Sequence, residues 1–204
     1  ETTGQNQILI VPGANASITD ADIARIAPVI AGSDILLVQL EINLDANWKC
    51  IDIAKKNGVP VILNPAPARA VPDDVLSKID ILTPNEVEAS ALSGVTVVTP
   101  ADAEKAARVF HSKGIDQVII TLGEQGAFVK NRDKAAMIEG IKVNAQDATG
   151  AGDAFNGGLA AALAEGRDLF EAAEFANKVG ALSVTKVGAA RAMPTRAEID
   201  AFEP

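Results

Sequence analysis

Two acidic residues flank a run of very small residues in the last third of the chain: Asp147 and Asp153, with Gly150, Ala151 and Gly152 between them. The apolar run that follows is interrupted by a single amide, so the pattern predicts a loop that leads into a helix. Small residues leave the N–H groups at a helix start accessible, and the positive end of the helix dipole attracts an anion. The stretch therefore predicts a cradle for a phosphate group.

An acid inside such a cradle needs an explanation. A carboxylate and a phosphate charge about 4 Å apart repel by roughly 4 kcal/mol at an effective dielectric of about 20. Accepting the proton of a hydroxyl group that attacks the phosphate is a task that would justify this repulsion. We therefore predict that Asp153 is the general base of a phosphoryl transfer.

Two familiar nucleotide-binding motifs do not match this stretch. It is not G-x-G-x-x-G, because Phe155 stands three residues after Gly152, and no Gly-Lys-Ser/Thr follows as in a Walker A loop. A plain tight turn with a helix cap would also produce the pattern. The stretch alone leaves both interpretations open.

Asn85 and Glu88 form a second candidate site at an expected helix start. Residues three apart share a helix face, and an amide beside a carboxylate suits a hydrated Mg²⁺ ion next to phosphates. A helix cap with a solvated acid is the alternative. Similarly, residues 187–193 form a loop whose carbonyl groups either bind a cation or face water, and the spacing does not separate the two.

These residues must be positioned by a larger framework of apolar runs and helical patterns. We expect strands at residues 8–11, 35–40, 59–64, 79–83 and 117–122, with helices at 23–32, 44–57, from 84, and at 101–113. Continuous apolar strands that alternate with helices predict a parallel sheet covered on both faces. Such sheets bind ligands beyond the carboxyl ends of their strands, where Glu41, Asn64, Asn85 and Gly123 stand.

The pattern changes after residue 122. We expect a turn at 123–126, strands at 127–129 and 138–143, and a helix from the small-residue stretch to about 165. Asp168 with Glu171 and Thr195 with Glu198 predict the capped starts of two further helices. The prediction is one three-layer α/β/α domain over residues 1–204, with a mostly parallel sheet and no second domain.

Composition narrows the class of protein. The net charge of −9, one Trp and the lack of Tyr argue against a nucleic-acid-binding surface. No apolar run in the sequence approaches the length of a membrane span. A single cysteine, Cys50, excludes an internal disulfide and suits a cytoplasmic protein.

Residues 147–158 resemble the C-terminal signature of the ribokinase-like (PfkB) carbohydrate kinases. Residues 63–68, 83–88, 121–126 and 187–194 also match this family in order and spacing, and most closely its ribose-phosphorylating members. The resemblance covers essentially the whole chain. It implies the family's fold and an ATP-dependent carbohydrate kinase.

The resemblance also implies roles for single residues. Asp153 would be the base and a sugar contact, with the N–H groups of Gly150, Ala151 and Gly152 stabilising the transition state, and Glu41 would bind the sugar. The family's ATP contacts fall on Asn85, Thr121, Leu122, Gly123, Glu124, Gln125, Gly126, Gly152 and Asn177. Glu88 would help to hold Mg²⁺, and an activating K⁺ would be held by Asp147, Thr149, Ser183, Lys186, Gly188 and Ala192. In two places the chain departs from the family, since Ala192 offers only its backbone where a hydroxyl is frequent and Asn177 replaces a common histidine.

The implied reaction is phosphorylation of D-ribose at its 5-hydroxyl by in-line transfer from ATP without a phosphoenzyme. A kinase of fructose, ketodeoxygluconate or a nucleoside, or a non-catalytic nucleotide-binding module, is the alternative. Family members carry a leading third with a lid, a homodimer surface and most sugar contacts, and no segment of this chain matches it. We therefore expect residues 1–204 to show little activity alone, and the complete protein to be a homodimer.

Overall fold

The computed structural model describes residues 11–203, which form a six-stranded sheet in the order β1 to β6. Strands β1 (Leu36–Val38), β2 (Val61–Leu63), β3 (Ile81–Leu82) and β4 (Gln117–Thr121) are parallel. Strands β5 (Gly126–Lys130) and β6 (Ala135–Glu139) continue the sheet in antiparallel pairing. The predicted mostly parallel sheet is confirmed.

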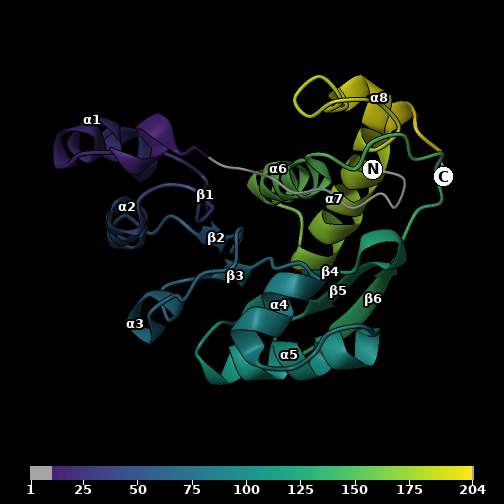
Figure 1. Cartoon of the computed structure of the whole chain (residues 1–204), viewed down its shortest axis with the longest axis horizontal. Helices are drawn as coiled ribbons and strands as arrows, with labels where there is room; N and C mark the ends of the chain where they lie inside the picture. The colour runs from purple at the N-terminus through teal and green to yellow at the C-terminus, as the bar shows by residue number, and fades with distance from the viewer. Residues whose placement is uncertain (1–10, 204) are drawn as a thin grey trace.

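Helices cover both faces of this sheet, as Figure 1 shows. Five helices lie on one face: α1 (Asp20–Ala31), α2 (Leu44–Lys56), α3 (Asp73–Leu76), α4 (Glu86–Ser93) and α5 (Pro100–Ser112). The other face is covered by α6 (Ala151–Ala164) and α7 (Leu169–Ser183), and α8 (Arg196–Ala201) packs against α7. Two short 3-10 helices, η1 (Gly13–Ala16) and η2 (Gly123–Gln125), complete the elements.

The strands alternate their side chains between two cores. Val61 and Leu63 are buried in the core beneath the first five helices, whereas Ile62 between them is buried against α6 and α7. Because successive strand residues point to opposite faces, this alternation produces three layers, helix, sheet and helix. The predicted three-layer α/β/α class is therefore confirmed.

Five helices begin with a capping box, in which the cap side chain and the residue three positions on satisfy each other's backbone N–H groups. These helices are α1, α4, α5, α7 and α8. The two boxes predicted from sequence, at Asp168 and Thr195, are among them. Helix α6 begins at a glycine instead and has no side-chain cap.

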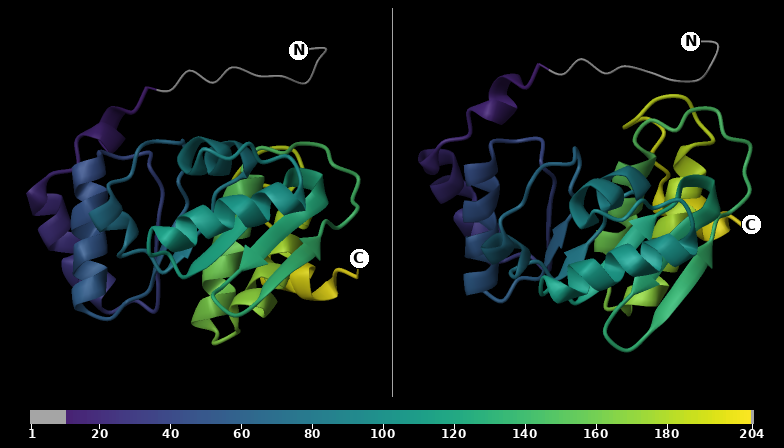
Figure 2. Two further views of the ribbon diagram at one scale, coloured as in Figure 1. Left: turned by 90° about the horizontal axis from the view of Figure 1, so that it is seen from below. Right: turned by 60° about the horizontal axis from the view of Figure 1, so that its bottom comes forward.

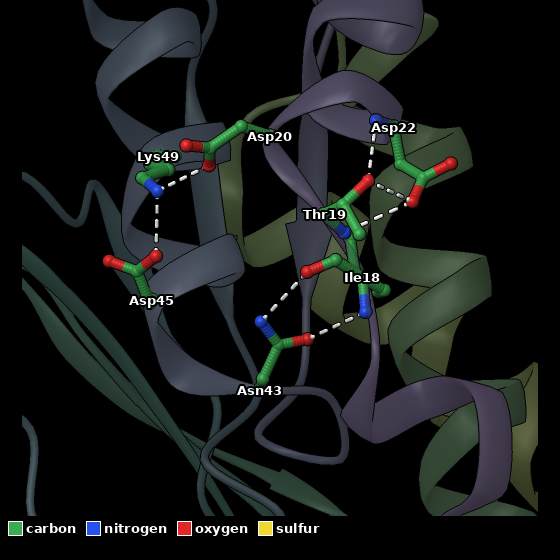
Figure 3. A network of polar contacts seen from close by, with 7 residues as sticks. All are labelled: Ile18, Thr19, Asp20, Asp22, Asn43, Asp45 and Lys49. Carbon is green, nitrogen blue, oxygen red and sulfur yellow. Dashed lines mark hydrogen bonds and ion pairs between the residues drawn. The ribbon is translucent and has the colours of Figure 1, made fainter.

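Polar contacts fix the start of α1 beside the start of α2 (Figure 3). The Asn43 side chain accepts the N–H of Ile18 and donates to its carbonyl, both at 3.2 Å. Lys49 Nζ lies 2.5 Å from Asp20 and 2.7 Å from Asp45. These contacts hold the first two helices together at one end of the molecule, opposite α8 in both views of Figure 2.

One expected strand was misplaced, one helix was missed, and one expected strand falls outside the described part. The strand expected at 138–143 is β6 at Ala135–Glu139, because the Asn131 side chain accepts the N–H groups of Asp133 and Lys134 and turns the chain back early. Helix α3 was not predicted. The strand expected at 8–11 falls almost entirely outside residues 11–203.

The remaining expected elements are present. Strands β1 to β4 are shorter than the apolar runs predicted, whereas β5 extends one residue further at each end than the predicted strand at 127–129. Among residues 11–203, every helix is too short or too polar to cross a lipid bilayer.

Candidate active site

The small-residue stretch forms the open start of helix α6. Gly150 is its N-cap, with φ +78°, a backbone conformation that favours glycine. The N–H of Ala151 donates to Ala148 O at 3.2 Å, whereas those of Gly150 and Gly152 have no backbone acceptor in the described part of the chain. Unpaired N–H groups at a helix start are suited to an anion, so the geometry fits the predicted cradle.

The space around this turn differs at its two glycines. A methyl group at Gly150 would lie 3.2 Å from Met193 Cε, so the loop before α8 closes one side of the turn. A methyl group at Gly152 would meet nothing within 4 Å. The side of the turn at Gly152 therefore has room for a ligand.

Asp153 lies on the first turn of α6 and is exposed. Its Oδ1 atom accepts a hydrogen bond of 2.7 Å from Gln39 Nε2, the amide at the carboxyl end of β1. Within residues 11–203 the carboxylate forms no ion pair. An exposed carboxylate without a cationic partner can accept a proton, as the predicted base must.

A chain of side-chain hydrogen bonds continues from Gln39 across the sheet. Gln39 Nε2 lies 3.4 Å from Asn64 Oδ1, and Asn64 Nδ2 donates to Thr83 O at 2.8 Å. Thr83 Oγ1 donates to Asn156 Oδ1 at 2.6 Å, and Asn156 Nδ2 donates to Gly152 O at 2.9 Å. The carboxyl ends of β1, β2 and β3 are thus joined to the first turn of α6.

Asn85 and Glu88 form the reciprocal cap of α4. Glu88 N–H donates to Asn85 Oδ1 at 2.8 Å and Asn85 N–H donates to Glu88 Oε2 at 2.9 Å. Glu88 is buried, and this burial raises the pKa of its carboxyl group against the opposing effect of the Asn85 N–H. The cap is therefore confirmed for the pair, but the alternative's solvated acid is wrong because Glu88 is buried. A metal role would have to be added to the cap.

The residues fit a Mg²⁺ ion only together with a phosphate ligand. No group of three or more His, Cys, Asp or Glu side chains that could hold a metal occurs within residues 11–203. Mg²⁺ commonly uses one or two carboxylates plus substrate phosphates and water. The second oxygen of Glu88 could serve as one such carboxylate ligand.

Apart from Gly152 on α6, the predicted ATP-binding residues lie in three connected segments: the start of α4, residues 121–126 and the middle of α7. Thr121, at the end of β4, bridges to Asn85, so the start of α4 adjoins the η2 loop. Gly140 N–H donates to Gln125 O at 3.0 Å, and Asn177 Nδ2 donates to Glu139 O at 2.9 Å. The loop, the end of β6 and the middle of α7 are therefore brought together, and their contact with a nucleotide stays a prediction.

Three of the predicted K⁺ ligands, Asp147, Thr149 and Gly188, are brought together by hydrogen bonds. Asp147 Oδ1 accepts the N–H of Thr149 and Oδ2 accepts the N–H of Gly188, each at 2.9 Å. Hydrogen bonds from Thr149, and then from Gly188, hold the pKa of Asp147 below its usual range. An ionised carboxylate near loop carbonyls is a donor set that suits a hard cation.

Other members of this set differ in what they can offer a cation. Lys186 Nζ pairs with Glu198 at 2.5 Å, and Lys186 and Ala192 have no side-chain acceptor, so these two residues could offer only their backbone carbonyls. Ser183 Oγ donates to Gly180 O at 2.7 Å and keeps its lone pairs.

Glu41 is exposed two residues after Gln39, and no hydrogen bond of its side chain occurs within residues 11–203. It shares with Asp153 the edge of the sheet where β1 ends. Its predicted contact with a sugar is untested by this geometry.

Sequence reasoning missed three residues of the site: Gln39, Thr83 and Asn156. A signal was present in two cases, because Gln39 interrupts the apolar run 35–40 and Asn156 is the one amide in the apolar start of α6. A lone polar residue in a buried run needs a hydrogen-bond partner. Which partner it finds depends on the tertiary fold.

Comparison with known proteins gives a consistent result. The model of the pfkB family carbohydrate kinase matches residues 1–196. Ribokinase of Haemophilus influenzae is 48% identical over 196 residues, and ribokinase of Staphylococcus aureus is 41% identical over 198 residues. These matches cover 96% and 97% of this chain.

The structure of Arabidopsis thaliana ribokinase complexed with ribose and ATP is also similar. It superposes with a TM-score of 0.90 at 33% identity and covers 100% of this chain and 67% of that chain. The present chain spans 64% and 65% of the two bacterial relatives.

Proposed function

Because the chain belongs to the pfkB family of carbohydrate kinases, we propose that the complete protein transfers the γ-phosphate of ATP to the 5-hydroxyl of D-ribose. The similar ribokinases support the choice of substrates. The observation that carries the chemistry is the exposed Asp153 carboxylate on the open start of α6, held by an amide. Two groups that assist a phosphoryl transfer, a proton acceptor and an anion cradle, thus lie on one helical turn.

The proposed step needs one proton acceptor and no covalent intermediate. Asp153 takes the proton of the sugar hydroxyl while the oxygen of that hydroxyl forms a bond to the γ-phosphorus. The bond from the γ-phosphorus to the bridging oxygen of ADP breaks. The N–H groups at the start of α6 stabilise charge on the transferred phosphoryl group. Asp153 afterwards releases its proton to water.

The proposal assigns the remaining groups to ATP and two cations. The η2 loop, Asn85 and Asn177 bind the nucleotide, and Glu88 with bound water holds Mg²⁺ at the phosphates. K⁺ binds at the loop that Asp147 and Gly188 join, where it would keep the cradle in place. The cations supply positive charge that offsets the charge of the phosphates.

Two rival functions remain distinguishable. A kinase of fructose, ketodeoxygluconate or a nucleoside would use the same base and cradle with a different sugar pocket. A non-catalytic nucleotide-binding module would keep the fold without chemistry, but it would bind phosphate better without the charge of Asp153. The exposed carboxylate therefore favours an enzyme.

A substrate panel tests the proposal. The complete protein is incubated with ATP, Mg²⁺ and K⁺ and with each of ribose, fructose, ketodeoxygluconate and adenosine, and ADP release is recorded. We expect the highest kcat/KM with ribose and a phosphorus NMR signal of a 5-phosphate. A higher kcat/KM with another sugar would replace the substrate, and nucleotide binding without sugar-dependent ADP release would favour the module.

The proposed assembly is a homodimer of the complete protein. Sedimentation equilibrium of that protein should give twice the mass of one chain. The mass of a single chain across micromolar concentrations would contradict it.

A further inference from the structure

We propose that Gln39 is a positioning residue that holds Asp153 in the orientation needed for proton transfer. This inference rests on the proposed function, because it assigns Gln39 a role through the base. Gln39 Nε2 donates to Asp153 Oδ1 at 2.7 Å, which leaves Oδ2 as the oxygen that can face a hydroxyl group. The contact joins two residues that lie 114 positions apart in the sequence.

The surrounding hydrogen bonds determine which end of the Gln39 amide faces Asp153. Asn64 Nδ2 is engaged by Thr83 O at 2.8 Å, so Asn64 Oδ1 is the atom that faces Gln39. A flipped Gln39 amide would place its oxygen against two acceptors, Asn64 Oδ1 and the Asp153 carboxylate. The N–H₂ end is therefore directed at Asp153, and the hydrogen bond fixes the orientation of the carboxylate.

Gln39 is itself held at its backbone and by its neighbours. Asn47 Nδ2, from α2, donates to Gln39 O at 2.6 Å, and the next residue, Leu40, donates its N–H to Ala66 O at 2.8 Å. Asn47 and Leu40 are buried. The amide therefore extends from a fixed point at the end of β1.

The hydrogen bonds close a ring that also includes the anion cradle. From Asn64 the ring passes through Thr83 to Asn156, which donates to Gly152 O, and Gly152 is bonded to Asp153 through the backbone. Asn64, Thr83 and Asn156 are all buried, so water competes weakly for these bonds. Base and cradle are thus held to the same three strand ends, and Gln39 is the ring member whose side chain touches the carboxylate itself.

The test replaces Gln39 by methionine, which has nearly the same length and no donor. In the complete protein, we expect Gln39→Met to lower kcat at least about tenfold. The loss should not exceed the roughly 10²–10⁴-fold that the general base itself contributes. KM for ATP and the midpoint of thermal unfolding should stay near those of the parent. Gln117→Met is the matched control. Gln117 is a half-buried glutamine at the amino end of strand β4, away from the carboxyl ends of the strands that carry the site, so this substitution should leave kcat unchanged.

A double-mutant cycle separates this inference from the proposed function. If Gln39 acts through Asp153, then Gln39→Met should not lower the residual turnover of Asp153→Asn any further. An inactive Asp153→Asn together with an unaffected Gln39→Met would overturn the positioning role and leave the base intact. Equal losses from Gln39→Met in both backgrounds would also overturn it, whereas full turnover by Asp153→Asn would refute the base itself.

Discussion

At the scale of single residues, the site consists of groups that each have one assigned task. Asp153 is exposed and bound by an amide, whereas Asp147 is bound by two backbone N–H groups and Glu88 is buried in a helix cap. Three carboxylates in three environments can perform three different tasks, because each has different hydrogen-bond partners and a different exposure to water. The proposal assigns them to proton transfer, K⁺ and Mg²⁺ in that order.

The environment of Glu88 leads to a prediction about stability and pH. Because burial raises the pKa of Glu88 in the folded chain, the folded chain binds the Glu88 proton more tightly than the unfolded chain does. Protonated Glu88 therefore favours folding at low pH, and this contribution to the free energy of unfolding is lost as pH rises through the folded pKa. Gln keeps the capping box without the charge. We expect Glu88→Gln to be at least as stable as the parent at pH 7 and to lose this advantage at pH 4, as urea unfolding would show.

The same variant should need more Mg²⁺ for half-maximal turnover in the complete protein. Glu86→Gln, two residues earlier on the same turn and outside the cap, is the matched control and should keep the parent's Mg²⁺ dependence. An unchanged Mg²⁺ dependence in Glu88→Gln would remove Glu88 from the metal site.

At the scale of elements, the position of α6 decides where both base and cradle lie. Helix α6 packs closely on α7, and Gly158 stands where α7 approaches: a methyl group there would lie 2.9 Å from Val179 Cγ2 and 3.3 Å from Ala176 Cα. At the adjacent Gly157 a methyl group would meet nothing within 4 Å. Close packing against α7 therefore requires a glycine at position 158, whereas position 157 has room for a larger side chain.

This contrast predicts opposite effects of the same substitution. Gly158→Ala should destabilise the fold by about 1–3 kcal/mol through overpacking. Gly157→Ala should stabilise it by about 0.5–1 kcal/mol, because alanine loses less backbone entropy in a helix. Urea unfolding of both variants gives the comparison, and a shift of the same sign in both would show that α6 does not pack on α7 as described.

Much of this framework could be predicted from sequence, since local patterns determine it. The caps at Asp168 and Thr195 and the extent of α2 depend on neighbouring residues, and they are confirmed. Strand β6 was misplaced because its start depends on the turn at Asn131 and on pairing with β5. The contact between Gln39 and Asp153 could not be predicted at all, because a bond across 114 positions depends on how β1 and α6 are brought together.

At the scale of the whole molecule, the side chains at the carboxyl ends of β1 to β3 are joined to Asp153 and the cradle, as expected for an open parallel sheet. Glu41 and Asp153 are both exposed at this edge, so water has access to the proposed reaction centre. Phosphoryl transfer to a sugar must compete with transfer to water, and kinases commonly exclude water by closing over the substrates. Residues 11–203 thus provide the base and cradle but leave them open to solvent.

We therefore expect the 204-residue chain alone to be a poor kinase. Its kcat with ribose should be about 10²-fold or more below that of the protein extended to the length of its relatives, since misplacement by about 1 Å can cost that much. Circular dichroism of both forms controls for folding. Equal kcat values from the two would show that the residues of this chain suffice.

The central claim is that the Asp153 carboxylate takes the proton of the attacking hydroxyl group. The most direct measurement is kcat and the ATP dissociation constant of Asp153→Asn in the complete protein, with ribose at saturation. We predict that kcat falls by about 10²–10⁴-fold, while ATP binds as tightly as before or more tightly because a repelling charge is gone. Turnover at the parent's rate in this variant would contradict the account.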